Sequence, residues 1–343
     1  MKKTLIAAAV AAAVAAPAAN AGVTIYGTMH VSIDYLDYGT STYNCDGNST
    51  PGGGYHVCTR TSKMGFKGSE DLGNGLKAIW KMESAVSIAD GGAKGGSWQS
   101  ARNSYIGLAG DWGTFLYGRH DTPYKMAFYS TGIDMLGDSF MDVNALYGIV
   151  EWRRDSAIAY VSPNWNGLTF AGAVIPGEGR TTDNGSLNDG FADSYSLGVM
   201  YSNNGLKLAA GYEDTQGETG QDSKEWMVGA GYSMNAFDVS AVYIDQEAPI
   251  PGIPELDTTV WAVSAAYTFG NNKIIGTVGQ NDWEAPGVSD DGMGYGVALQ
   301  HMFSKRTSAY IGYSTTEALN LHKTVDYAGI DSEAVSFGMI HNF

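Results

Sequence analysis

The sequence predicts an all-β protein, a transmembrane antiparallel β-barrel of about sixteen strands, and three observations favour it. Apolar and small residues alternate with a period of two along many segments of roughly ten residues, which is typical of strands with one apolar face. Short turns and long loops alternate between these segments, as in an up-and-down barrel. Only 16% of the 343 residues are charged, and 46 are glycine.

This composition also excludes other classes of protein. Lys and Arg number 20 against 36 Asp and Glu, so a basic nucleic-acid-binding protein is excluded. Each of the many glycines would destabilise a helix interior by about 1 kcal/mol relative to alanine, which disfavours a helical enzyme. We expect residues 22–343 to form a single barrel domain, because all-β barrels reach this length as one unit.

Residues 1–21 are predicted to be a cleaved signal peptide. Lys2 and Lys3 precede an apolar run from Leu5 to Ala16, and Ala19-Asn20-Ala21 fits the small-residue cleavage rule. The apolar run is shorter than the about 20 residues that a membrane-spanning helix needs. Export places Cys45 and Cys58 in an oxidising compartment, so we expect a disulfide between them. A zinc site is less favoured, because only His56 lies nearby.

The strand pattern is clearest in the second half of the chain. Between Val260 and Phe269, residues such as Trp261, Val263 and Tyr267 form one face. Similar alternation runs through residues 195–201, 226–233 and 294–299, where Gly, Ser and Ala dominate the opposite face. A solvated sheet would carry Lys, Glu and Thr there, so the pattern indicates an apolar outer face and a small-residue inner face.

The connections divide into two kinds. Short polar turns are expected at 71–75, 110–113, 163–167, 202–205, 270–272 and 304–306, where Asn-Gly and Gly-Asn steps tolerate a positive φ. Long loops are expected at 39–58, 89–101, 120–154, 176–192, 214–222, 246–258, 282–291 and 315–333. Because the long loops alternate with the short turns, they gather at one end of the barrel.

Aromatic residues mark the short-turn end. Tyr201, Tyr232, Phe269 and Phe303 each lie one or two residues before a tight turn, as amphipathic rings do at a membrane interface. A soluble β-sandwich also alternates, but it does not explain the aromatic residues, the one-sided loops and the low charge together. The final strand places Val335, Phe337, Met339, His341 and Phe343 on one face, and we expect it to close the barrel against residues 23–37.

Four segments together resemble the general-diffusion porins of Gram-negative bacteria, a family of trimeric sixteen-stranded outer-membrane barrels. They are residues 63–78 (KMGFKGSEDLGNGLKA), 103–108 (NSYIGL), 118–123 (GRHDTP) and 337–343 (FGMIHNF). The family commonly has Arg where Lys63 stands and basic residues at Ile340 and Asn342. These departures do not affect the fold prediction. They do mean that the roles of pore residues in the family apply less directly to this chain.

The resemblance implies a water-filled channel for passive diffusion of small hydrophilic solutes and ions, with no enzyme activity, cofactor or metal. It implies a homotrimer in the outer membrane, surrounded by lipid and lipopolysaccharide. It also implies that Phe337, Met339 and Phe343 belong to a signal read by the barrel-assembly machinery. The third long loop, about 120–154, would fold into the lumen as a constriction loop. Its acidic residues are Asp121, Asp134, Asp138, Asp142 and Glu151.

Basic residues gather opposite this acidic loop in the sequence. Nine of the eighteen Lys and Arg residues after residue 21 lie between Arg60 and Lys125. Side-chain parity points Lys63, Lys67, Lys77 and Lys81 inward, because a charge on the lipid face costs about 2–4 kcal/mol near the midplane. Lys67 and Lys77 lie close to the short-turn end, so a position at the rim of the barrel explains these two equally well. Arg102 and Arg119 are expected to join them in the pore wall, with a bulge near Gly118. A basic wall facing an acidic loop would set up a transverse field.

Two alternatives remain at this point. One is an outer-membrane barrel enzyme such as a lipid hydrolase, which would need a Ser/His/Asn or Ser/His/Asp set near the outer girdle. We find no such set in the sequence. The other is a substrate-selective channel or an adhesin, which would differ only in its loops. For ion selectivity we expect a weak, salt-dependent preference for cations, because the net charge after residue 21 is 18 − 36 = −18.

Overall fold

The computed structural model describes residues 22–38, 54–89, 98–181, 187–216, 222–247, 256–317 and 332–343. The first half of the wall contains β1 (Thr24–Tyr38), β2 (Gly54–Thr59), β3 (Lys63–Gly73), β4 (Leu76–Val86), β5 (Trp98–Ala101), β6 (Ser104–Gly110), β7 (Gly113–Asp121), β8 (Arg153–Val161) and β9 (Leu168–Ile175). The second half contains β12 (Ser194–Asn203), β13 (Leu206–Thr215), β14 (Ser223–Met234), β15 (Phe237–Glu247), β16 (Asp257–Phe269), β17 (Asn272–Ala285), β18 (Val288–Met302), β19 (Thr307–Thr316) and β20 (Ser332–Asn342).

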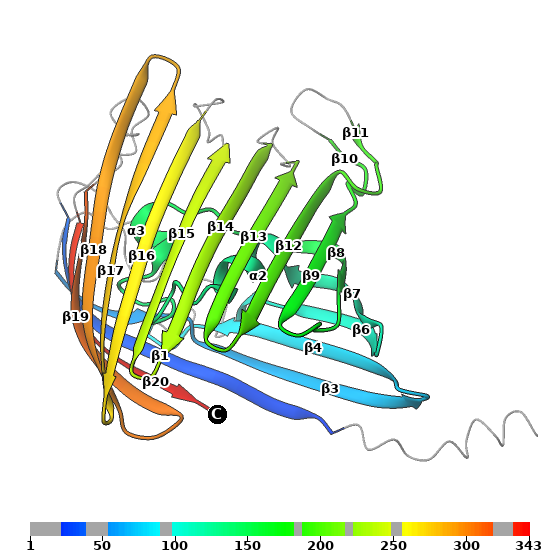
Figure 1. The fold of residues 1–343 in the computed structure, drawn as a ribbon, viewed down its shortest axis with the longest axis horizontal. Helices are drawn as coiled ribbons and strands as arrows, with labels where there is room; N and C mark the ends of the chain where they lie inside the picture. The colour runs from blue at the N-terminus through cyan, green and yellow to red at the C-terminus, as the bar shows by residue number, and fades with distance from the viewer. Residues whose placement is uncertain are drawn as a thin grey trace, which may run out of the picture.

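These eighteen strands form one closed antiparallel sheet (Figure 1). Both β2 and β3 pair with β1, and both β5 and β6 pair with β4, so each of these two pairs continues a single wall strand. Eighteen minus two gives sixteen strands around the barrel, as the sequence predicts. The final strand β20 closes the barrel on β1, with partners from Thr28–Asn342 to Tyr38–Ser332. A separate hairpin, β10 (Arg180–Thr181) and β11 (Leu187–Asn188), extends beyond the wall.

The short turns follow the predicted chemistry. Asn74, Asn166 and Asn204 have φ values of 53°, 53° and 48°, and each precedes a glycine with positive φ. A further short turn, which the sequence analysis did not identify, joins β14 to β15 through Asn235, with φ 53°. The predicted long loop 282–291 is wrong. Instead β17 and β18 remain paired as far as Ala285 and Val288, so this hairpin ends in a tight turn.

The outward face of the barrel is apolar, as the alternation predicts. Val297 is 50% exposed, whereas its neighbour Ala298 is buried. The aromatic residues Tyr232, Phe269 and Phe303 are exposed near the short turns. A second set of outward aromatic residues lies six to eight residues away along the strands and includes Tyr195, Tyr212, Trp226, Tyr243, Tyr295 and Tyr313. The two belts are about 20–26 Å apart along a strand at about 3.3 Å per residue. At a strand tilt of about 40° this is about 15–20 Å along the barrel axis, so the belts lie within the apolar band of about 25 Å of an outer-membrane barrel.

The inward face is covered in part by the long connection between β7 and β8. This connection contains α2 (Pro123–Ser130) and α3 (Val143–Tyr147), which lie inside the barrel in Figure 1. No helix among the described residues is long and apolar enough to cross a membrane. Small inward residues let the connection approach the wall. A Cβ at Gly198 would lie 2.5 Å from the Pro123 carbonyl oxygen, and one at Gly231 would lie 2.3 Å from that of Thr131.

Candidate pore constriction

The connection between β7 and β8, residues 122–152, has well-defined local structure, and we name it the constriction loop. The hydroxyl of Thr122 caps α2 by accepting a hydrogen bond from the Lys125 amide, and Pro123 occupies the first turn. Asp142 caps α3 in the same way, accepting from the Asn144 amide at 3.0 Å. Gly148 ends α3 in the left-handed conformation, with φ 65°.

Apolar side chains hold this loop to one side of the barrel. Near its start, Tyr124 and Phe128 are fully buried in a cluster with residues of β13–β16 such as Ile244. Near its middle, Phe140 and Met141 are buried against residues of β16–β19 such as Tyr310. The loop therefore packs against the wall on the β13–β19 side.

Hydrogen bonds from wall side chains to carbonyl groups of the loop fix the position of the loop along the barrel axis. Ser240 donates to the Thr131 carbonyl at 3.0 Å, and Asn281 donates to the Tyr147 carbonyl at 2.6 Å. Ser314 donates to the Phe140 carbonyl at 2.8 Å. Because small polar residues on three separate parts of the wall satisfy loop carbonyls, the loop is fixed along much of its length.

A cavity of about 750 Å³ separates the exposed edge of the loop from the opposite wall, and we name it the central cavity. Its charged lining residues are Lys63, Arg102, Lys125, Arg153, Asp121, Asp134, Asp138 and Glu151. Six of these eight are residues that the sequence analysis proposed for the pore. The other two, Lys125 and Arg153, were not among the proposed site residues, although both lie within or beside the loop. Lys63 of β3 and Arg102, between β5 and β6, face acids of the loop across this space.

The basic wall is organised around a buried acid that the sequence analysis missed. Glu83 accepts from Arg102 Nε at 2.9 Å and from the Tyr26 hydroxyl at 2.8 Å. It also forms an ion pair with Lys81 at 3.2 Å. Lys67 and Lys81 are cross-strand partners and lie over the same Tyr26 ring, at 5.1 and 5.6 Å from its centroid. Glu83 has the same parity as Lys81 on β4, and that parity could have identified it.

The middle of the loop is also tied to the basic side. Asp138 accepts a hydrogen bond from the Thr61 hydroxyl. The adjacent Arg60 forms an ion pair with Asp34, which is fully buried on β1. These contacts place the Asp138 carboxylate between the loop and the β1–β3 wall.

Ion pairs also fix both ends of the loop. Asp121 pairs with Arg153 at 2.7 Å and accepts from Asn103 Nδ2 at 2.6 Å. Lys125 forms an ion pair with Glu151, which joins the first helix to the end of the loop. Arg119 lies outside the central cavity and pairs with Asp155 at 2.7 Å. The predicted irregularity near Gly118 is present as a register shift between Gly118 and His120.

Three carboxyl groups of the loop form a cluster. Oxygens of Asp134, Asp138 and Asp142 all lie within 4.8 Å of one another. Burial and the neighbouring Asp138 raise the pKa of Asp142 to about 7. Burial and Asp142 raise the pKa of Asp134 well above its usual range. Carboxyl groups this close reduce their repulsion by binding protons or a divalent cation, so the charge of the loop depends on conditions.

A second acid pair lies behind the loop. Glu213 and Glu225 are fully buried cross-strand partners on β13 and β14. The Trp152 indole donates to Glu225 at 3.2 Å, and Arg154 Nε lies 4.0 Å from Glu213. The Trp152 contact joins the end of the loop to the wall.

The remaining predicted residues lie away from the constriction. Cys58 is fully buried on β2, while Cys45 lies outside the described residues, so the disulfide between them stays a prediction. Residues 1–21 also lie outside the described part. Phe337, Met339 and Phe343 are exposed on the outward face at the end of the chain. Phe343 and Gly27 exchange two backbone hydrogen bonds of 3.1 Å, which completes the seam of the barrel.

Comparison with known proteins identifies the family that the chain resembles. A family model described as "Gram-negative porin" matches residues 7–321. The chain is 31% identical to the major outer membrane protein P.IB of Neisseria lactamica, with all of both chains covered. It is 32% identical to the protein of the same name from Neisseria meningitidis, covering 91% of this chain and 92% of that one.

Solved structures share the fold at lower identity. An anion-selective porin from Comamonas acidovorans has a TM-score of 0.73 at 21% identity, covering 94% of this chain and all of that one. OmpF of Salmonella typhi has a TM-score of 0.68 at 19% identity, covering 94% and 98%. OmpT of Vibrio cholerae, in a trimer form, has a TM-score of 0.65 at 16% identity, covering 94% and 99%.

Proposed function

The chain belongs to the Gram-negative porin family and is an outer-membrane diffusion channel rather than an enzyme, and from this premise we propose how its pore is built. The constriction lies between the acidic edge of residues 121–152 and the basic wall formed by Lys63 of β3 and by Arg102, between β5 and β6. One observation carries this proposal: the central cavity is lined by both groups at once. Small hydrophilic solutes and ions pass through the transverse field between them.

Ion selectivity in this arrangement is weak. Four bases and four acids line the central cavity, so their charges cancel when all are ionised, and the raised pKa of Asp134 leaves at most a small positive excess. The chain carries 36 acids against 20 bases, and this excess concentrates cations at the wide mouth. The mouth is screened over a Debye length of about 8 Å at physiological salt. We therefore expect a modest cation preference that declines as salt rises.

Single-channel recordings of the purified protein in planar bilayers test this proposal. We expect discrete conductance steps in KCl and a small cation preference in reversal potentials across a KCl gradient. Lys81→Ala removes a base that pairs with Glu83 and is expected to strengthen the cation preference. Lys305→Ala, in the turn after β18, is the matched control. A clear anion preference of the unmodified channel at low salt would show that the basic wall outweighs the acidic mouth.

The homotrimer is supported by the outward face of β1. Ile25, Met29 and Ile33 are exposed there and form an aliphatic stripe that ends at the exposed Tyr35. A stripe of aliphatic side chains can pack against the same stripe on another copy of the chain.

Gel mobility tests the trimer. Unboiled detergent samples are expected to run as a high-mass band that becomes a monomer on heating. Met29→Glu places a charge in the proposed contact and should lower the temperature of that change, whereas Met29→Leu should not. A monomer band at every temperature, together with negative cross-linking, would exclude the trimer.

A further inference from the structure

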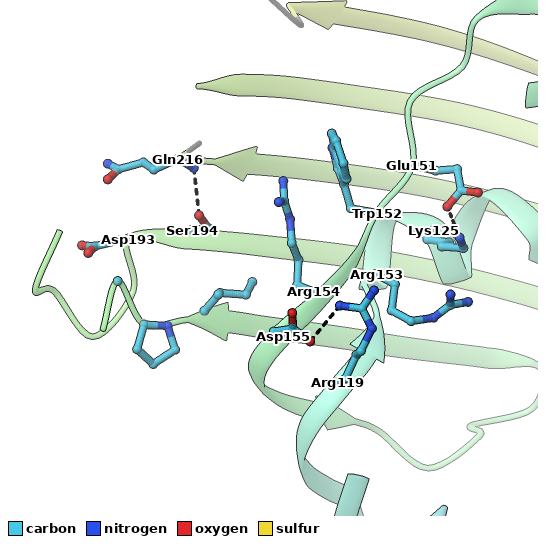
Figure 2. Close-up of a pocket in the computed structure, with 13 residues that line it drawn as sticks. Arg119, Lys125, Glu151, Trp152, Arg153, Arg154, Asp155, Asp193, Ser194 and Gln216 are labelled. Carbon is cyan, nitrogen blue, oxygen red and sulfur yellow. Dashed lines mark hydrogen bonds and ion pairs between the residues drawn. The ribbon is translucent and has the colours of Figure 1, made fainter. Parts of the chain in front are cut away.

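A second cavity, of about 380 Å³, lies beside the end of the constriction loop, and we name it the arginine cavity (Figure 2). One side is formed by Arg119 of β7 and by the stretch from Glu151 to Asp155 that begins β8. The other side is formed by Ile175, Pro176 and Gly177 after β9, by Asp193 and Ser194 at the start of β12, and by Gln216 after β13. It therefore opens between the long-loop ends of these strands.

Basic groups outnumber acidic groups in this lining. The bases are Arg119, Lys125, Arg153 and Arg154, and the acids are Glu151, Asp155 and Asp193. Two of the bases pair with carboxylates that do not line the cavity, since Arg153 pairs with Asp121 and Arg154 lies near Glu213. Guanidinium groups offer planar, two-pronged donors that match a carboxylate.

One ion pair in the cavity is open to exchange. Arg119 pairs with Asp155 at 2.7 Å, but the Asp155 side chain is 64% exposed. An exposed pair of this kind contributes little stability. Because Asp155 presents a carboxylate to Arg119 from solvent, a carboxylate on a dissolved molecule can take its place with similar geometry. Figure 2 shows the ion pair between Arg119 and Asp155 as a dashed line.

The cavity also offers a flat aromatic surface. Trp152 is 37% exposed and its indole is fixed by the hydrogen bond to Glu225. The Arg154 guanidinium lies 4.3 Å from the centroid of the Trp152 ring. A planar group stacks favourably on an indole or a guanidinium, so a flat ring is favoured over a puckered one of similar size.

The arginine cavity is adjacent to the central cavity, because Lys125, Glu151 and Arg153 line both spaces. A molecule held between Arg119 and Trp152 therefore lies next to the constriction, and the residues between the two spaces are charged rather than apolar.

We propose that the arginine cavity is a binding subsite for small aromatic carboxylates, which are held there before they pass the constriction. The carboxylate binds Arg119 in place of Asp155, and the ring stacks beside Trp152. This inference rests on the proposed pore and adds a solute class that the pore concentrates.

Block of the KCl current by benzoate tests the subsite. Benzoate is expected to interrupt the current of single channels in a concentration-dependent way, and cyclohexanecarboxylate to bind several-fold more weakly. Arg119→Gln removes a charged donor and should weaken benzoate binding about tenfold. Asp155→Asn removes the competing carboxylate and should strengthen it about threefold. The matched control is the pair Lys273 and Asp238, 3.9 Å apart near the short-turn end, where Lys273→Gln and Asp238→Asn should leave benzoate binding unchanged.

The outcomes separate the subsite from the pore. The subsite is excluded if Arg119→Gln and Asp155→Asn change benzoate binding no more than the control variants do. It is also excluded if benzoate and cyclohexanecarboxylate block equally. Either result, obtained with normal conductance steps in KCl, would leave the proposed pore intact. Absence of conductance steps in the unmodified protein would contradict the pore itself.

Discussion

Acidification should shift the ion selectivity of this channel toward anions, because it removes negative charge from the constriction loop. The perturbation acts on the cluster of Asp134, Asp138 and Asp142. Burial and like-charge repulsion raise the pKa of Asp142 to about 7, so its proton is lost as the pH rises through that value. The group is about 99% protonated at pH 5 and about 99% ionised at pH 9 for a pKa near 7. Arg60 opposes this rise in pKa, and Glu151 reinforces it.

The size of the effect follows from Coulomb's law. A unit charge about 6 Å from a permeating ion in water contributes about 0.7 kcal/mol, and screening reduces this to about 0.3 kcal/mol at physiological salt. A cation gains what an anion loses, so the free energies for the two ions differ by about 0.6 kcal/mol. The cation-to-anion permeability ratio should therefore change about threefold for each carboxyl group that titrates.

Reversal potentials across a KCl gradient at pH 5, 7 and 9 measure this change. A chelator in the buffer keeps divalent cations from the cluster. The double variant Asp134→Asn with Asp142→Asn is expected to remove most of the pH dependence, whereas Asp238→Asn at the short-turn end is expected to keep it. A shift toward cations on acidification would refute the reasoning. So would full pH dependence in the double variant.

Three further predictions concern assembly and packing. Tyr147→Ala removes a buried ring that packs the loop on β17 and β18, and it should weaken the attachment of the loop to the wall by about 3–5 kcal/mol. We expect larger and noisier single-channel currents, whereas Tyr147→Phe should behave nearly as the unmodified protein. Unchanged currents in Tyr147→Ala would contradict the packing. Deletion of Phe343 removes the two hydrogen bonds to Gly27 and should lower the amount of assembled protein in outer-membrane fractions, and normal amounts would argue against this. Thiol labelling of denatured, unreduced protein should detect neither Cys45 nor Cys58, since closing this small ring stabilises by roughly 3 kcal/mol, and two labelled thiols would disprove the bond.

The wall of the barrel could be predicted from the sequence because its strands and turns are determined by residues close together in the chain. Alternation with a period of two reports the face of each side chain, and Asn-Gly steps report tight turns. Both signals hold for residues such as Val297 and Asn204. The hairpin of β17 and β18 escaped prediction because Asp282 and Asp291 lie beyond the aromatic belt. A strand that extends past the membrane into water no longer needs an apolar outer face.

The constriction could be predicted only in part. The acids of the loop were predicted because they lie in an unusually long loop. The bases of the wall were predicted because their position in each strand points them inward. Glu83 shares the inward parity of Lys81, but its role became clear only through its ion pair with Arg102. The pair of Glu213 and Glu225 gave no such signal, because a partner such as Trp152 lies far away in the sequence. The Gly, Ser and Ala content of the inner face was noticed, but its cause is the close approach of the loop, which no local pattern reveals.

Chemical modification of engineered cysteines during current recording shows which side chains line the conducting path, and therefore whether ions pass between the constriction loop and the basic wall. A positively charged methanethiosulfonate reagent is applied to Lys63→Cys and Asp138→Cys, on the two sides of the central cavity, and to Val297→Cys on the outward face. The unmodified protein is the control. We expect the reagent to change the current through the first two channels and to leave Val297→Cys unaffected. Insensitive channels with cysteine at positions 63 and 138, together with a sensitive Val297→Cys channel, would contradict it.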